Sequence, residues 1–461
     1  MVARTHGERG PLRHVDVWRL AWPIMVSMLS YTAMSVVDTL FVGQLGTAPL
    51  AAVGASASLV HLVMAFPQGL LGGVRVRVAH ATGAGDADAA RHAAWQGVWL
   101  ALAFGGLAAL LAPWWSEAVL VLMGVGDEVA RLGGEYVFVR VVGAPVLLMS
   151  TALSAWFQGR GDTRVPMVAS VLGNLVNIGL DPILIFGMGP IPAMGVAGAA
   201  AATVVGLGTM VLVMAAVALR GLLLRPVGLR RAVLRQVWRV GAPQGAQFTL
   251  EVGSFTLFAA MLAWAGEAHL AAHVVVVRII LVSFLPCHAL GQAAGVLVGQ
   301  ALGASSTARA RQAVWLATLQ AVGIMVVMGA VFIAVPDLLT GAFGAEAEVQ
   351  ALARQVLLLY AAVQVLDAVA VVGLCSLSGA GDTRFVLVVT VGLAWFVKVP
   401  LAWALSVGLE LGVLGAWLGL AGEFSVLAVI VSLRLRGRRW LGHLDAEREV
   451  APEVEVAPSP A

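Results

Sequence analysis

The chain has 461 residues, of which 60% are hydrophobic and only 11% are charged. Soluble domains carry about 25% charged residues, so this composition excludes a protein built from soluble domains. We therefore expect a polytopic membrane protein. Long runs of Leu, Val, Ala and Gly favour transmembrane helices over the alternating pattern of a β-barrel.

A helix needs roughly 20 apolar residues to cross a bilayer. Glycine, proline and charged residues divide the chain into twelve candidate spans, at about 19–42, 52–78, 93–116, 130–157, 165–187, 194–219, 240–264, 270–300, 312–335, 351–378, 385–408 and 413–433. We expect an all-α integral membrane protein with twelve transmembrane helices.

The polar segments between these spans predict the domain organisation. We expect an N-terminal segment, an N-lobe with six spans, a linker, a C-lobe with six spans and a C-terminal tail, at residues 1–18, 19–219, 220–239, 240–433 and 434–461. The first segment has no apolar core of a signal peptide. The end of the tail is acidic and contains proline, as is typical of disordered segments.

Arginines gather on one side of the predicted membrane. The linker at 220–239 carries six arginines, and four more lie between Arg434 and Arg439. The turns on the other side carry mainly acids, among them Asp127 and Glu128. Because cytoplasmic loops are rich in Lys and Arg, we expect an inner (plasma) membrane protein with both termini in the cytoplasm.

The chain repeats itself at an offset of 220 residues. Gly-Asp-Thr-Arg occurs at 161–164 and again at 381–384. The same offset relates Arg19 to Arg239, Pro23 to Pro243 and Trp95 to Trp315, and after the fifth span an offset of 217 relates Gly195 to Gly412 and Gly198 to Gly415. Because each half has six spans, an even number, both halves have the same orientation in the membrane. Parallel repeats of this kind occur in secondary transporters, with the binding site between the halves near mid-membrane.

Some ionisable residues lie inside the apolar spans of the first half, where each costs about 2.5–3.5 kcal/mol. Asn174, Asn177 and Asp181 share one helix face, and Asp38 lies in the first span. Pro182 weakens the local backbone hydrogen bonds. The two carboxylates and two amides of Asp38, Asn174, Asn177 and Asp181 predict a site that shares a proton or holds a small cation, with Na⁺ expected at Asp38, Asn177 and Asp181. The alternative is a polar clamp between helices without a role in transport.

The second half carries a different set of acids. Glu251 and Asp367 lie in spans seven and ten, and Phe258 stands at the repeat position of Asp38. These acids predict an ion or substrate site, with hydration in a water-filled cleft as the alternative. For Glu423 a structural and a functional role both stay open. The bases inside spans are possible counter-ions whose pairing the sequence does not give: Arg140, Arg278 and Lys398.

Five motifs resemble one known family, the multidrug and toxic compound extrusion (MATE) transporters. They are VVDTLFVGQLG at 36–46, QGRGDTR at 158–164, NLVNIGLDPILIFG at 174–187, LVGQALGA at 297–304 and SGAGDTR at 378–384. The resemblance covers residues 15–435 and implies two six-helix bundles in a V.

The resemblance also implies a function. Members export organic cations in exchange for H⁺ or Na⁺ through a cavity that alternates between faces. It places an ion-coupling site at Asp38, Asn174, Asn177 and Asp181, adds Thr203 from the segment at 198–203, and gives Glu251 and Asp367 an ion or substrate role in the second lobe. We expect a monomeric antiporter in contact with lipid, without catalytic residues, cofactor or nucleic-acid partner.

Three other functions are alternatives. A flippase-like exporter of a lipid-linked, anionic or zwitterionic substrate requires a cationic cavity, with Arg140, Arg278 and Lys398 facing inward. A membrane enzyme requires clustered His, a nucleophile with a base, or a metal set, and the sequence shows none of these. A channel requires no coupling gradient, and the two-lobe repeat argues for rocking rather than a fixed pore.

Overall fold

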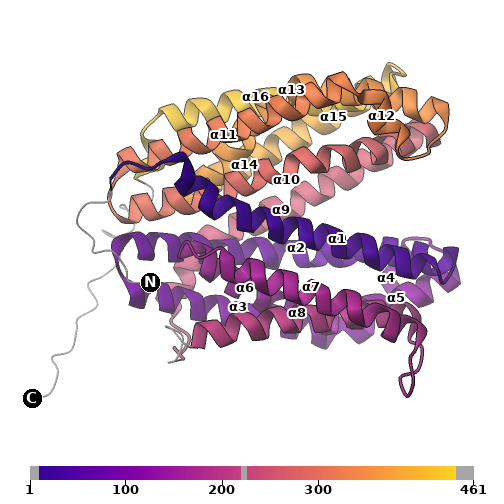
Figure 1. Ribbon diagram of the computed structural model, residues 1–461, viewed down its shortest axis with the longest axis horizontal. Coiled ribbons are helices and arrows are strands. Elements are labelled where there is room, and N and C mark those ends of the chain that lie inside the picture. Colours follow the sequence, from indigo (N-terminus) through magenta and orange to yellow (C-terminus); the bar gives the residue numbers. More distant parts are fainter. Residues whose placement is uncertain (1–9, 220–225, 443–461) are drawn as a thin grey trace, which may run out of the picture.

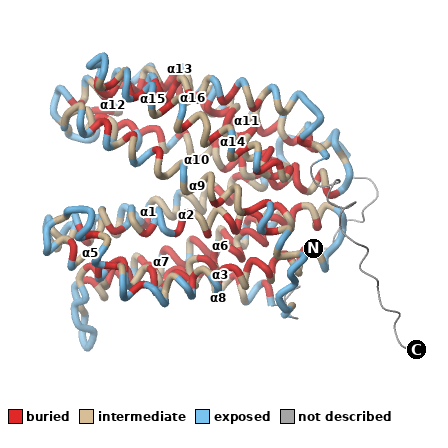
Figure 2. The backbone as a smooth tube through the Cα atoms, turned by 180° about the vertical axis from the view of Figure 1, so that it is seen from behind, coloured by how far each residue is buried: buried red, intermediate tan, exposed pale blue. Residues whose placement is uncertain are grey.

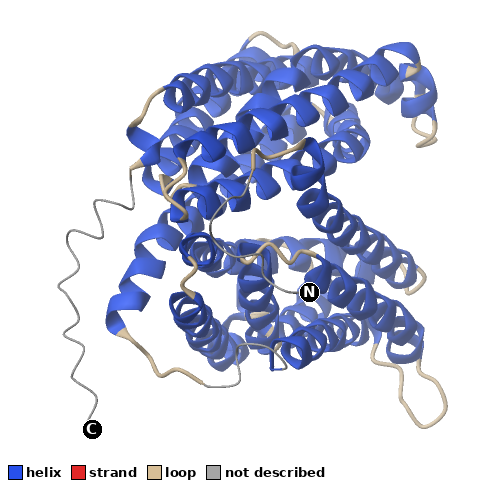
Figure 3. Cartoon of the chain, turned by 60° about the vertical axis from the view of Figure 1, so that its left-hand side comes forward, coloured by secondary structure: helices blue, strands red, loops and turns tan. Residues whose placement is uncertain are grey.

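The computed structural model describes residues 10–219 and 226–442, which are almost entirely helical (Figure 3). The first half contains α1 (His14–Gly43), α2 (Thr47–Ala84), α3 (Ala87–Trp115), α4 (Ala118–Leu122), α5 (Asp127–Val142), α6 (Ala144–Gly159), α7 (Arg164–Phe186) and α8 (Gly195–Leu219). The second half contains α9 (Arg231–Ala265), α10 (Glu267–Gly303), α11 (Thr307–Ala334), α12 (Pro336–Gly341), α13 (Ala347–Gly379), α14 (Thr383–Leu393), η1 (Ala394–Lys398), α15 (Val399–Trp403), η2 (Ala404–Gly408), α16 (Gly412–Arg436) and η3 (Arg439–Leu441).

The span count confirms the predicted fold class. Eleven helices of the described residues are long and apolar enough to cross a membrane, and α5 with α6 forms a twelfth span that bends by 48°. The bend lies at Gly143, just before Pro145, which has no N–H to donate and whose ring crowds the preceding turn. The sequence predicted this span at 130–157 but gave no sign of the bend.

Several helices extend past the predicted spans. Helix α1 begins at His14 rather than at 19, α9 begins at Arg231 inside the predicted linker, and α16 continues to Arg436. Polar and charged residues form these extra turns because the ends of the helices reach beyond the apolar interior of the membrane. Parts of the predicted N-terminal segment, linker and tail, namely 1–9, 220–225 and 443–461, lie outside the described residues.

The helices form two lobes, which Figure 1 separates by colour. The N-lobe contains α1–α8 and the C-lobe α9–α16. We call the face where α1 and α9 begin and α16 ends the terminus face, and the opposite one the distal face. Figure 2 shows buried residues within each lobe and the two lobes diverging towards the distal face.

The lobes join where α2 packs against α9. Glycines of both helices lie at this crossing, so the backbones approach closely, as in membrane helix pairs with small residues at the interface. A Cβ on Gly69 would lie 2.7 Å from the Gln244 carbonyl oxygen, and one on Gly73 would lie 2.6 Å from that of Val237. The two glycines of α9 at this contact, Gly241 and Gly245, meet the α2 backbone in the same way.

Candidate functional site

The predicted N-lobe site is assembled from three helices. Asn174, Asn177 and Asp181 are buried on one face of α7, Asp38 reaches them from α1, and Thr203 is buried on α8. The Asn177 amide donates to Asp181 over 3.5 Å. The Asp38 carboxyl lies close to the side chains of Asp181, Thr203 and Asn177. The five residues that the sequence and the resemblance named therefore lie together.

This cluster leaves oxygen atoms without hydrogen-bond partners. Among the described residues, Asp38 Oδ1, Asn177 Oδ1 and Asp181 Oδ2 are buried and unpaired. Buried polar atoms are normally hydrogen-bonded, and carboxylate and amide oxygens are suitable ligands for hard cations. The three residues predicted to hold Na⁺ are thus the ones with free oxygen atoms, and the two adjacent carboxyl groups also suit a shared proton. Asn174 instead donates to the Ser30 hydroxyl at 2.7 Å.

The surroundings of Asp38 include residues that the sequence analysis did not assign to the site. Tyr31 of α1 and the buried Tyr136 of α5 lie in the electrostatic environment of Asp38. Arg140, one turn after Tyr136, interacts with the Asp38 carboxylate as well. Arg140 is therefore part of the electrostatic surroundings of Asp38, although no ion pair joins the two residues in the described part of the chain. The spacing of Tyr136 and Arg140 on one helix face was visible in the sequence, but their distance from Asp38 was not.

The predicted C-lobe acids line a separate cavity of about 740 Å³. Glu251 comes from α9, Asp367 from α13 and Glu423 from α16, and all three lie at the cavity wall. The Tyr360 hydroxyl donates a hydrogen bond of 3.0 Å to Asp367. Aromatic rings form part of the remaining wall, with Phe248, Phe255, Phe284, Tyr360, Trp417 and Phe424 among the lining residues. Carboxylates among aromatic rings are suitable for binding an organic cation.

The N-lobe contributes to this cavity mainly through α2 and α6. Arg75 of α2 is positioned there by Gln292 of α10, which accepts its hydrogen bond at 2.8 Å, and by Gln158 of α6 at 3.4 Å. The residues of the N-lobe cluster are not among those that line the cavity. The cavity lies between the lobes, as predicted, but the two predicted acidic sets form two distinct sites.

The three bases inside spans have different surroundings. Lys398 lines the cavity, and its ammonium lies 3.5 Å from the Glu423 carboxylate. Arg278 is exposed on α10, and Arg140 is near Asp38, so neither lines the cavity. The cationic cavity that a flippase-like exporter requires is therefore not formed by these three residues together.

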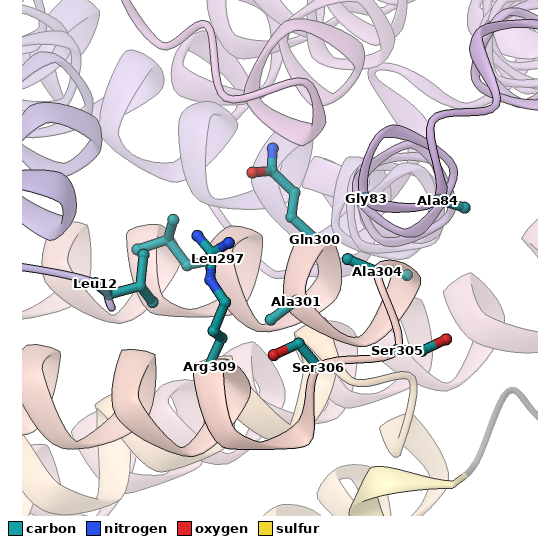
Figure 4. A pocket seen from close by; sticks show the side chains of 11 residues that line it. Leu12, Gly83, Ala84, Leu297, Gln300, Ala301, Ala304, Ser305, Ser306 and Arg309 are labelled. Carbon is teal, nitrogen blue, oxygen red and sulfur yellow. The ribbon is translucent and has the colours of Figure 1, made fainter. Parts of the chain in front are cut away.

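Towards the terminus face the lobes are joined by a pair of hydrogen bonds that follow the repeat. The His80 ring of α2 is bonded to the Gly379 carbonyl of α13 at 2.9 Å, and Gln300 of α10 donates to the Gly159 carbonyl of α6 at 3.0 Å. Both pairs of residues are related by the offset of 220. We call these two bonds the latch. Gln300 also lines a second pocket, of about 560 Å³, together with Gly83 and Ala304 (Figure 4).

Two six-span lobes related by a parallel repeat, with a charged cavity between them, define a polytopic membrane transporter. The sequence profile of the MatE family matches residues 23–183 and 243–404, and the chain belongs to this family. The motifs predicted this membership, which is thereby confirmed.

Similar proteins span nearly the whole chain. The Probable multidrug resistance protein NorM of Pseudomonas putida is 30% identical, over 94% of this chain and 96% of its own length. The protein of the same name from Burkholderia mallei is 32% identical, over 92% of each chain. The crystal structure of a MATE protein in complex with MaL6 superposes with a TM-score of 0.85 at 25% identity, covering 95% of this chain and 98% of that one.

Proposed function

We propose that the protein is a secondary active antiporter that exports organic cations in exchange for H⁺ or Na⁺. The observation that carries this proposal is the separation of two acidic sites. The C-lobe set faces a cavity lined in part by aromatic rings, whereas the N-lobe set is a compact cluster with unpaired oxygen atoms. The names of the NorM relatives support multidrug export as the activity.

In this mechanism the cavity binds the substrate and the N-lobe cluster binds the coupling ion. Glu251 and Asp367 attract the substrate cation, and Asp38, Asn174, Asn177, Asp181 and Thr203 hold H⁺ or Na⁺. The ion changes the conformation only to the extent that it binds one state better than the other. One charge that crosses 100 mV supplies about 2.3 kcal/mol, which supports a concentration ratio of roughly 50.

The arginine distribution supports a plasma-membrane protein with the terminus face in the cytoplasm. The latch then closes the cytoplasmic end, while the lobes diverge towards the outside (Figure 2). The described conformation is the one that receives the coupling ion and releases substrate. Both sites are built within one chain, which is consistent with a functional monomer.

The test is efflux of a fluorescent organic cation from proteoliposomes under a pH gradient or a Na⁺ gradient, applied one at a time. We expect one gradient to drive efflux, and Asp38→Asn to abolish it while folded protein remains in the membrane. Glu251→Gln tests the cavity, and Arg278→Gln serves as a control because Arg278 lies outside both sites. Normal coupled efflux by Asp38→Asn would refute the N-lobe assignment, and efflux without either gradient would refute antiport.

A further inference from the structure

The two lobes can be aligned residue by residue from their closest helix contacts. Gly198 of α8 packs against the backbone of Leu184, and Gly415 of α16 packs against the backbone of Leu405 through the same atoms. The glycines are related by an offset of 217 and the leucines by 221. The extra residue of the π-turn η1 accounts for the change from 220 to 221 along this helix.

This alignment pairs Lys398 with Asn177 and Glu423 with Gly206. In the N-lobe a Cβ on Gly206 would lie 3.0 Å from the Asn177 Cβ, so these two positions are in contact. In the C-lobe the corresponding positions carry an ammonium and a carboxylate, which form the ion pair at 3.5 Å. The position that Asn177 occupies within the N-lobe ion site is thus filled in the C-lobe by the ammonium group of Lys398.

Lys398 is held in a site built for an ammonium group. Its Nζ donates to the Ser254 hydroxyl at 2.9 Å and lies 4.0 Å from the centre of the Phe255 ring. The side chains of Lys398 and Glu423 are 1% and 5% exposed. A carboxylate and an aromatic face around a cation are the same groups that recognise organic ammonium ligands.

We propose that Lys398 is a tethered cation that occupies a cation subsite formed by Glu423 and Phe255, and that an organic cation enters this subsite by displacing the Lys398 ammonium. The inference rests on the proposed function and adds a specificity-determining residue to it. If Lys398 is a tethered cation, removing its ammonium strengthens the binding of organic cations. If Lys398 is instead an anchor for anionic substrates, removing its ammonium weakens substrate binding.

The first test is binding of tetraphenylphosphonium to the full chain in nanodiscs. We expect Lys398→Met to bind this cation about tenfold more tightly than the wild type, since a like charge is removed from the subsite. The gain should shrink in the Glu423→Gln background, because the subsite then lacks its carboxylate. Arg278→Met is the control, since it removes a cation from a span that does not line the cavity.

The second test uses the fact that Lys398 is the only lysine in the chain. Biosynthetic ¹³Cε-lysine gives one side-chain resonance, which we expect to shift as tetraphenylphosphonium saturates the cavity. If Lys398→Met fails to fold because Glu423 is left unpaired, the shift of this resonance in the wild-type protein remains the test.

The outcomes distinguish the two proposals. Unchanged affinity in Lys398→Met, or a lysine resonance that does not move at saturation, overturns the tethered-cation proposal alone. Absence of binding to the wild type and to every variant overturns both proposals. Binding only after loss of the lysine also overturns the tethered-cation proposal, because the cation then does not displace the ammonium in the wild type.

Discussion

Removal of the Gln300 bond should shift the equilibrium between the two conformations of the transporter. Gln300→Ala deletes the Gln300 half of the latch, a neutral hydrogen bond of 3.0 Å between the lobes. Such a bond contributes about 1 kcal/mol net, and water in the neighbouring pocket (Figure 4) can satisfy the Gly159 carbonyl afterwards. We therefore expect the ratio of the described state to the alternative one to fall about fivefold.

The assay measures distances between spin labels at the exposed positions Glu117 and Glu346, one in each lobe near the distal face, after replacement of both native cysteines. Gln350→Ala is the matched control. Gln350 also donates from its amide to a backbone carbonyl, that of Ala345 at 2.6 Å, but within one lobe. An unchanged distance distribution in Gln300→Ala, or an equal shift in Gln350→Ala, would refute the latch.

Three further predictions concern single positions. Tyr360→Phe removes the hydrogen bond to Asp367, and we expect weaker substrate binding by about tenfold or more, measured by equilibrium titration. Gly241→Leu should lower the free energy of unfolding by about 1–3 kcal/mol, because the α2 backbone leaves no room for a side chain; Gly54→Leu, in open space, should leave the thermal midpoint unchanged. Asn177→Lys should place an ammonium between the N-lobe acids and abolish ion-driven efflux while cavity binding persists, as measured in parallel in nanodiscs.

The fold followed from composition because a bilayer requires long apolar helices, whatever their detailed packing. Twelve runs of apolar residues predicted twelve spans, and matched Arg, Pro and Trp residues predicted two equivalent halves. The bend at Gly143 was not predictable from the apolar pattern. It depends on a proline just inside α6 and on the packing of the neighbouring helix, neither of which changes the hydropathy.

The N-lobe cluster was predictable because three of its residues lie on one face of one helix. Asn174, Asn177 and Asp181 recur at helical spacing, so the sequence alone brings them together. In the C-lobe each charged residue comes from a different helix. The sequence identified Lys398 and Glu423 as charged residues inside apolar spans. It did not predict that they pair, because the pairing depends on how η1 packs against α16.

The repeat also explains why the lobes share an architecture but differ in chemistry. The contacts that align them are made by glycines against backbone atoms, as Gly198 does with Leu184 and Gly415 with Leu405. Backbone contacts constrain where helices lie and leave the neighbouring side chains free to change. Each of the two π-turns in the second lobe adds a residue, which increases the offset between the lobes above 220. The connection before α16 is shorter than its counterpart in the N-lobe, and it lowers the offset to 217. Because π-turns widen a helix locally and occur often at functional sites, the insertion that shifts the register is also the one that places Lys398 at the cavity.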